Sequence, residues 1–96
     1  MTKAMGREEV ETVALRALAF VAGDEALLGR LQGATGASLD DLRAGAQEPA
    51  MLAAVLEFLT SEDRWILAFA EAEGLRPEDP MRALMALPGG RRDEWP

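Results

Sequence analysis

The spacing of the apolar residues constrains the fold of this chain more than any other feature. From Val10 to Val21 the apolar side chains recur every three or four residues, which is the repeat of an amphipathic α-helix. Alanine and leucine, with 18 and 14 copies, supply a third of the 96 residues and are strong helix formers. β-branched residues are scarce and never alternate with polar ones as they do in a strand. The sequence therefore predicts an all-α fold.

Capping residues and glycines divide this pattern into a compact bundle of five to six short helices. Asp24 and Ser38 stand where helix N-caps are expected, and Asp41 completes a capping box with Ser38. Thr60 or Ser61 is expected to cap the helix that follows them. The predicted segments are Arg7 to Gly23, Asp24 to Gly36, Ser38 to Gly45, Pro49 to about Thr60, Glu62 to Glu73, and Met81 to Leu87.

The fifth of these segments contains an unbroken apolar run from Trp65 to Ala70. A helix that is apolar on all sides is typically surrounded by others, so this segment is predicted to be the central helix. Residues 7–88 form a single helical domain in this interpretation. Residues 1–6 are expected to be a flexible N-terminus and residues 89–96 a flexible charged tail, because Pro88, Gly89 and Gly90 end the helical pattern.

The chain also contains a candidate internal repeat with an offset of 38 residues. Val13 to Gly36 aligns without a gap on Met51 to Gly74, although few of the aligned pairs are identical. A true duplication predicts two three-helix units related by a pseudo-two-fold axis. Chance similarity between amphipathic helices of equal length is the alternative, and both remain open on the sequence alone.

The missing residue types exclude many kinds of chemistry. The chain has no histidine and no cysteine, which excludes disulfides, thiol nucleophiles, zinc sites with these ligands and the commonest general base. The formal net charge of −7 argues against nucleic acid and against an anionic membrane surface. No apolar run approaches the roughly 18 residues that a transmembrane helix needs, and the start resembles no signal peptide. We expect a cytoplasmic protein that uses no cofactor and binds neither nucleic acid nor membrane.

Acidic pairs are the only catalytic groups that the composition offers. They are Asp40 and Asp41, Glu62 and Asp63, Glu78 and Asp79, and Glu71 and Glu73. Each pair lies in the first or last turn of a predicted helix, where acids at a helix start are stabilised by the macrodipole. A hydrolytic pair needs two carboxylates in one cleft, one of them kept protonated by burial. The spacing favours structural roles, and we predict that the protein is not an enzyme.

A few apolar residues do not fit the predicted core. Leu15 and Leu67 fall on the polar sides of their helices, and Trp95 stands in the charged tail without a local hydrophobic partner. Trp95 either folds back onto the domain or is an exposed aromatic anchor. The candidate interaction residues are Leu15, Leu67, Met81, Leu84, Met85 and Trp95, of which the two methionines and Leu84 form an apolar strip on the last helix.

Several segments of the chain resemble a small bacterial family of helical proteins, domain of unknown function 3572. The resemblance lies in Glu11 to Phe20, Gly23-Asp24, Leu28 to Leu31, Gly36 to Arg43, Leu56 to Leu59 and Leu67 to Ala70. These segments consist mostly of core leucines, alanines and caps. The resemblance implies an all-helical fold and brings no catalytic residues with it.

Two functional hypotheses follow. The first is a non-catalytic helical protein-interaction module, an adaptor or a self-associating unit, whose partner is an unidentified protein or a second copy in a homo-oligomer. The alternative is a small ligand-binding domain or enzyme that uses carboxylates in a cavity of the bundle. The first is preferred because catalytic side chains are missing whereas apolar residues outside the core are not.

Overall fold

The computed structural model describes residues 6–87, and every regular element in this range is an α-helix. The predicted all-α bundle is confirmed. The helices are α1 (Arg7–Ala22), α2 (Glu25–Thr35), α3 (Leu39–Ala44), α4 (Pro49–Leu59), α5 (Asp63–Glu73) and α6 (Asp79–Ala86). All six contribute buried side chains to one hydrophobic core.

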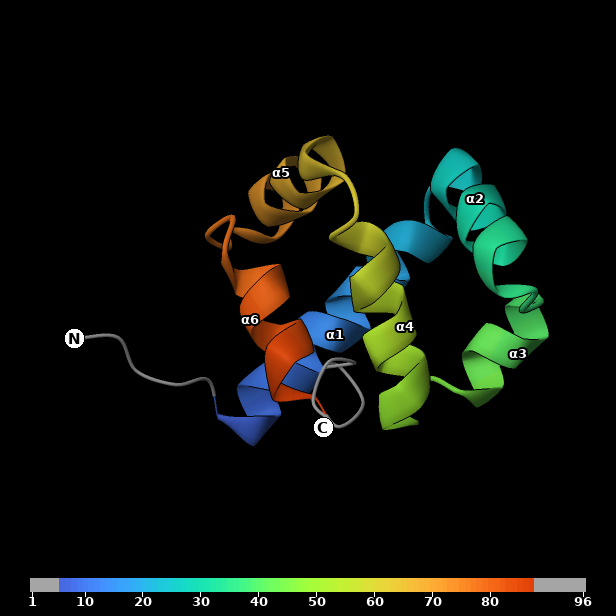
Figure 1. Ribbon diagram of the computed structural model, residues 1–96, viewed down its shortest axis with the longest axis horizontal. Helices are drawn as coiled ribbons and strands as arrows, with labels where there is room; N and C mark the ends of the chain where they lie inside the picture. Colours follow the sequence, from blue (N-terminus) through green and yellow to red (C-terminus); the bar gives the residue numbers. More distant parts are fainter. Residues whose placement is uncertain (1–5, 88–96) are drawn as a thin grey trace, which may run out of the picture.

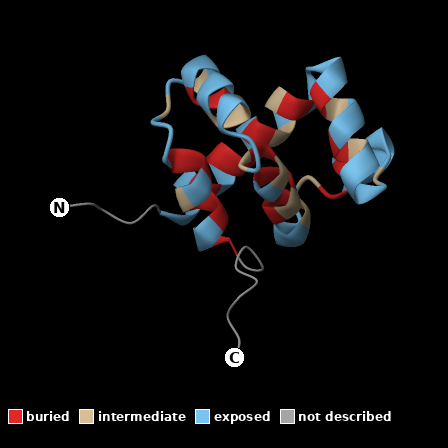
Figure 2. Cartoon of the chain, turned by 45° about the horizontal axis from the view of Figure 1, so that its top comes forward, coloured by how far each residue is buried: buried red, intermediate tan, exposed pale blue. Residues whose placement is uncertain are grey.

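Three helices form the centre of this core. In Figure 1, α4 and α6 lie side by side across α1, while α5 lies beyond one end of α6 and the α2–α3 pair lies on the far side of α4. α1 carries small buried residues, and its Ala14 and Ala17 are completely buried. Small side chains allow helices to approach closely. Val55 and Leu56 of α4 and Ala83 of α6 are likewise fully buried, and Figure 2 shows the buried residues gathered between these helices.

The prediction that the fifth helix is central was wrong. Only Phe69 and Ala70 of α5 are buried, while Trp65 is half-buried and Leu67 is 55% exposed. The helix lies on the outside of the bundle, against α1 and α6, so only part of its circumference is covered. Two aromatic contacts hold it there: the Phe69 ring meets that of Phe20 edge-on with centroids 5.3 Å apart. The second contact joins α5 to α4, where the Trp65 and Phe58 rings stack at 4.9 Å.

Several predicted helix ends are confirmed by hydrogen bonds. The Asp24 carboxylate accepts from the backbone N–H groups of Ala26 and Leu27, which otherwise lack a partner in the first turn of α2. Ser38 and Asp41 form the reciprocal capping box of α3, each side chain accepting from the other residue's N–H at 3.0 Å. Pro49 occupies the first turn of α4, where no N–H is required.

Two predicted boundaries need correction. Thr60 and Ser61 do not cap α5; their hydroxyls donate to the carbonyl groups of Leu56 and Phe58 and so complete the end of α4 instead. The N-cap position of α5 is Glu62, which makes no side-chain capping bond. The last helix begins at Asp79 rather than at Met81, because a proline is tolerated in the first helical turn.

The offset of 38 residues reappears in the local structure but not in the packing. α2 and α5 are equally long and begin 38 residues apart, and both end at a left-handed glycine, Gly36 with φ of 76° and Gly74 with φ of 69°. The third helices of the two units differ, however: α6 packs against both α1 and α4, whereas α3 has no comparable contact with either. The two-fold arrangement is not confirmed, and duplication stays a prediction.

The predictions of a flexible N-terminus over 1–6 and a flexible tail over 89–96 concern residues that lie, apart from Gly6, outside the described range. Gly6 occupies the N-cap position of α1, and its N–H donates to Glu9 Oε1 at 3.4 Å.

Replacing Phe69 with alanine is expected to lower the free energy of unfolding by about 3–5 kcal/mol, because the ring is fully buried and its removal leaves a cavity. Leu67→Ala in the same helix is the matched control, with an expected change within about 0.5 kcal/mol at its exposed site. Urea unfolding followed by circular dichroism measures both. Equal effects of the two substitutions would contradict the placement of α5.

Two glycines of α2 are expected to respond to alanine in opposite directions. Gly36→Ala should lower stability by about 1–2 kcal/mol, because φ of 76° is strained for a residue with a Cβ atom. Gly33→Ala should raise it by about 0.5–1 kcal/mol, since the site is helical and nothing lies within 4 Å of the new Cβ atom. Thermal unfolding of the two variants tests the end of α2, and a shift of the same sign in both would contradict it.

Candidate functional site

Four of the six predicted interaction residues are exposed in the structure. The exposed fractions are 43% for Leu15, 55% for Leu67, 42% for Met81 and 47% for Met85. Leu84 is a correction: it is only 6% exposed and belongs to the core, because it lies on the side of α6 that faces the other helices. Trp95 lies outside the described residues.

Leu15 is the predicted residue with the most informative surroundings, because it forms one wall of a groove. The groove has a volume of about 310 Å³ and lies where the middle of α1 meets the start of α4 and the end of α6. We call it the Leu15 groove. Its lining residues are Glu11, Leu15, Ala46, Gln47, Pro49, Leu52 and Leu87.

The chemistry of the Leu15 groove is mainly apolar. Leu52 and Leu87 are buried and present only small parts of their surfaces, while Leu15 and Pro49 are exposed. Glu11 contributes a carboxylate one helical turn before Leu15. Apolar walls with a few polar groups are typical of binding grooves, and this volume is near the lower end of the usual range of about 300–1,000 Å³. A groove of this volume accommodates one large side chain of a partner rather than a whole protein surface.

Most residues of this groove could not be recognised from the sequence. Pro49 was predicted to start the fourth helix, which is correct, but a helix start does not connect this residue with Leu15. The only sequence signal was that Leu15 falls outside the apolar face of its helix. The remaining predicted residues, Leu67 and the two methionines, do not line this groove.

A second groove, of about 450 Å³, runs along the N-terminal half of α1 beside the connection between α5 and α6. We call it the Asp79 groove. It is more open than the Leu15 groove. The residues that line it are Glu8, Glu9, Thr12, Val13, Arg16, Leu75 and Asp79.

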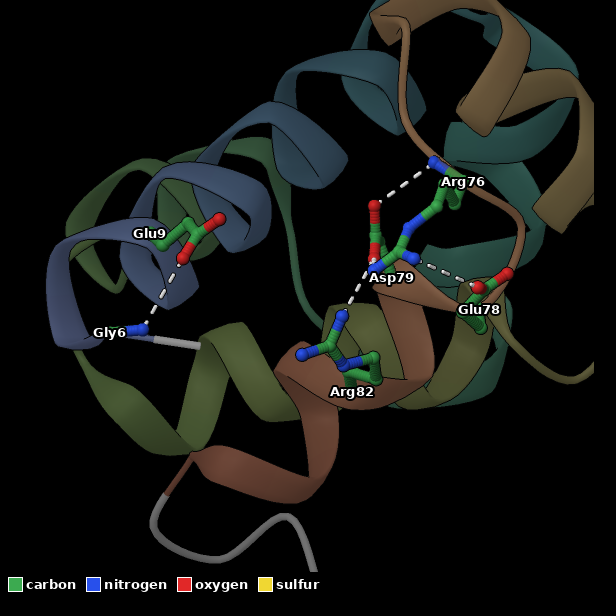
Figure 3. A network of polar contacts seen from close by, with 6 residues as sticks. All are labelled: Gly6, Glu9, Arg76, Glu78, Asp79 and Arg82. Atoms are coloured by element: carbon green, nitrogen blue, oxygen red, sulfur yellow. Dashed lines mark hydrogen bonds and ion pairs between the residues drawn. The ribbon is translucent and has the colours of Figure 1, made fainter. Parts of the chain in front are cut away.

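Asp79 is the only buried charged residue among residues 6–87, with 8% of its surface exposed. One of its carboxylate oxygens, Oδ2, accepts the backbone N–H of Arg76 at 3.0 Å and so holds the turn that leads into α6. The other, Oδ1, lies 3.4 Å from Nη1 of Arg82 and 3.6 Å from Nη2 of Arg76. Figure 3 shows the two guanidinium groups converging on this carboxylate, with Glu78 Oε2 3.6 Å from Nη1 of Arg76. The bonds of Asp79 therefore give it a clear structural role.

Several carboxylates of the acidic pairs named in the sequence are bonded within the fold. Asp41 caps α3, and the Asp40 carboxylate lies 4.0 Å from the Arg43 guanidinium. Glu73 bonds to Arg16 at 3.2 Å across the gap between α5 and α1. Within the described range, no set of three or more potential metal-ligating side chains comes together in a way that fits an ion.

The paired arginine side chains are distributed over the surface, each beside an acidic residue, and do not form one basic patch. Arg16, Arg43, Arg64 and Arg82 each lie within 4.0 Å of a carboxylate. These pairs are formed by different helices or helix ends, and most are exposed. Exposed pairs of this kind contribute little to stability.

Fold and surface together define a small all-α domain with two grooves along its first helix. The chain belongs to the family described as protein of unknown function (DUF3572), whose model matches residues 7–90. The match covers the whole described helical domain, which agrees with the resemblance seen in the sequence. Comparison with curated proteins and with solved structures found no match. In residues 6–87, no helix has both the length and the apolar character required to cross a membrane.

Replacing Asp79 with asparagine is expected to lower the free energy of unfolding by about 1–3 kcal/mol, because the neutral side chain loses its ion pairs at a buried site. Glu78→Gln is the matched control: its exposed pair with Arg76 should contribute less than about 1 kcal/mol. Denaturant unfolding measures both variants. A stabilised Asp79→Asn variant would contradict the structural role and point to an acid retained for function.

Proposed function

We propose that the protein is a non-catalytic helical module of the cytoplasm that binds a protein partner through the Leu15 groove. The observation that carries this proposal is the position of Leu15, a large apolar side chain 43% exposed to solvent on the wall of a groove formed by three separate elements. An exposed apolar side chain beside a concave surface is a common feature of binding sites.

The size and chemistry of the groove limit the kind of partner. A volume of about 310 Å³ accepts one large apolar side chain from a peptide segment, in the manner of an anchor residue. Glu11 at the groove favours a basic group next to that anchor. The proposed ligand is therefore a segment with an aromatic or large aliphatic residue flanked by arginine or lysine. The net charge of −7 supports the same preference and disfavours nucleic acid.

The other exposed apolar residues support the proposal more weakly. Met81 and Met85 are one turn apart on α6 and are both about half exposed. Flexible methionine side chains adapt to varied partners. They offer a second contact area for a larger partner or for a second copy of the chain.

A ligand-binding domain or enzyme that uses carboxylates is the second candidate. Its supporting observation is Asp79, a buried acid that lines a groove together with Glu8 and Glu9. We place it second because the Asp79 carboxylate is already bonded to the Arg76 backbone and paired with two guanidinium groups.

Affinity capture from the native host with the wild-type chain and two variants tests the proposed function. Leu15→Arg puts a bulky charge into the groove, whereas Leu67→Arg makes the same change at an exposed site on α5. We expect at least one host protein to be captured by the wild type and by Leu67→Arg but lost with Leu15→Arg, as quantified by mass spectrometry.

Circular dichroism of the purified variants establishes that both keep the fold. Capture that is unchanged by Leu15→Arg would contradict the role of the groove. Light scattering over a range of concentrations separates the two kinds of partner: a dimer that Leu15→Arg dissociates identifies a second copy, and a strict monomer at high concentration excludes it.

A further inference from the structure

The two grooves of the domain lie on either side of one exposed stripe of α1. The Leu15 groove includes Glu11, and the Asp79 groove includes Glu8 and Glu9. Because an α-helix has about 3.6 residues per turn, Glu9 and Glu11 point to nearly opposite sides of α1, and Glu8 falls between them. All three glutamates are exposed. A peptide chain that crosses the surface of α1 at this point therefore reaches both grooves.

The start of α1 is the source of negative charge at both grooves. Residues 7–11 contain three glutamates and one arginine, which gives this segment a formal charge of −2. Within residues 6–87, the ion pairs of the fold include none of these three glutamates. Their charge therefore remains available to attract a basic partner.

The other charges that line the Asp79 groove are balanced within the fold. Arg16 pairs with Glu73 at 3.2 Å. The Asp79 carboxylate lies near the guanidinium groups of Arg76 and Arg82. The glutamates of α1 are therefore the groups whose charge a bound segment would meet in this groove.

The walls of the Asp79 groove also suit a long basic side chain. Val13 and Leu75 supply apolar surface. The methylene groups of an arginine or lysine pack on such a surface while the charged end stays in water. Because the groove is open, a charged end beside Glu8 keeps its contact with solvent.

The distance between the two contact points fits a short extended segment. Glu8 and Leu15 are seven residues apart on α1. At roughly 1.5 Å per residue, this separation is about 10 Å along the helix axis. An extended chain advances about 3.3 Å per residue, so about three residues cover the same distance. Thr12 lies between the two points, and its short exposed side chain leaves room for a backbone to cross.

We propose that one basic segment of a partner protein occupies both grooves. Its apolar anchor lies in the Leu15 groove, and its backbone crosses α1 beside Thr12. An arginine or lysine three or four positions from the anchor lies in the Asp79 groove beside Glu8. This inference rests on the proposed function and adds a second contact point to it. The anchor supplies most of the affinity, whereas the exposed glutamates select a basic segment and speed its association.

Titration of the isotope-labelled full chain with synthetic peptides tests this path by nuclear magnetic resonance. The probes are the peptide Ser-Trp-Ser-Gly-Arg-Arg-Ser and the same sequence in reverse order, so that both directions across α1 are covered. We expect one of them to shift the backbone amide signals of Leu15 and Gln47 and also those of Glu8 and Thr12. The matched control peptide carries glutamate in place of both arginines and is expected to bind several-fold more weakly.

A double substitution, Glu8→Gln with Glu9→Gln, removes the charge of the second contact point. It should raise the dissociation constant of the arginine peptide about two- to fivefold, the range expected for exposed ion pairs, and reduce its dependence on salt. Glu71→Gln is the matched control, since it removes an exposed acid that lines neither groove, and should leave the constant unchanged. Circular dichroism establishes that the variants keep the fold.

Leu15→Arg separates this inference from the proposed function. If it abolishes peptide binding while the double glutamine variant and the glutamate peptide bind as strongly as their counterparts, the groove remains a binding site and the path across α1 is overturned. If it leaves peptide binding unchanged, the role of the groove falls as well.

Spermidine carries positive charge without an apolar anchor, so it should leave the Leu15 signal in place. Shifts equal to those caused by the arginine peptide would show that charge alone accounts for binding and would overturn the two-point segment. The absence of any shift with either peptide would also overturn it, whereas the capture experiment tests the proposed function independently of these peptides.

Discussion

The close packing of α4 and α6 on one side of α1 is the constraint on which the rest of the structure depends. α1 packs against both α4 and α6, and the small residues Ala14 and Ala17 of α1 and Ala83 of α6 are all fully buried. The distance between packed helices depends on the side chains at their contact, and small residues allow the closest approach. Two helices can therefore share one side of α1, which leaves α2, α3 and α5 to cover the periphery of the core.

Both grooves follow from this arrangement, because α1 is longer than the helices that cover it. The Leu15 groove lies where the start of α4 and the end of α6 meet α1, and the Asp79 groove lies beside the turn that leads into α6. The two grooves differ in the role of one lining residue each, Asp79 in one and Leu15 in the other. The buried acid in one groove is bonded to the backbone and to two arginines, whereas the exposed leucine in the other has no comparable structural role.

The accuracy of the sequence analysis varied with the range of the interactions involved. Capping bonds join residues three or fewer positions apart, so Asp24, Ser38 and Asp41 were interpreted correctly. The central position assigned to the fifth helix was wrong, because hydrophobicity measures the tendency to be buried but not which neighbour provides the burial. Leu84 was misplaced for a similar reason: it stands between two exposed methionines in the sequence, and only the position of α6 shows which of the three faces the core.

The sequence by itself determined the helical class, most helix ends and the absence of histidine and cysteine chemistry, because these depend on residue type and on contacts within one or two turns. Only the tertiary structure decided that α1 packs against most of the other helices, that Asp79 is buried, and that Pro49 and Leu87 line the same groove as Leu15. These residues are far apart in the chain and are brought together by side-chain packing between helices. Such packing depends on the shape of the whole core, which no local pattern contains.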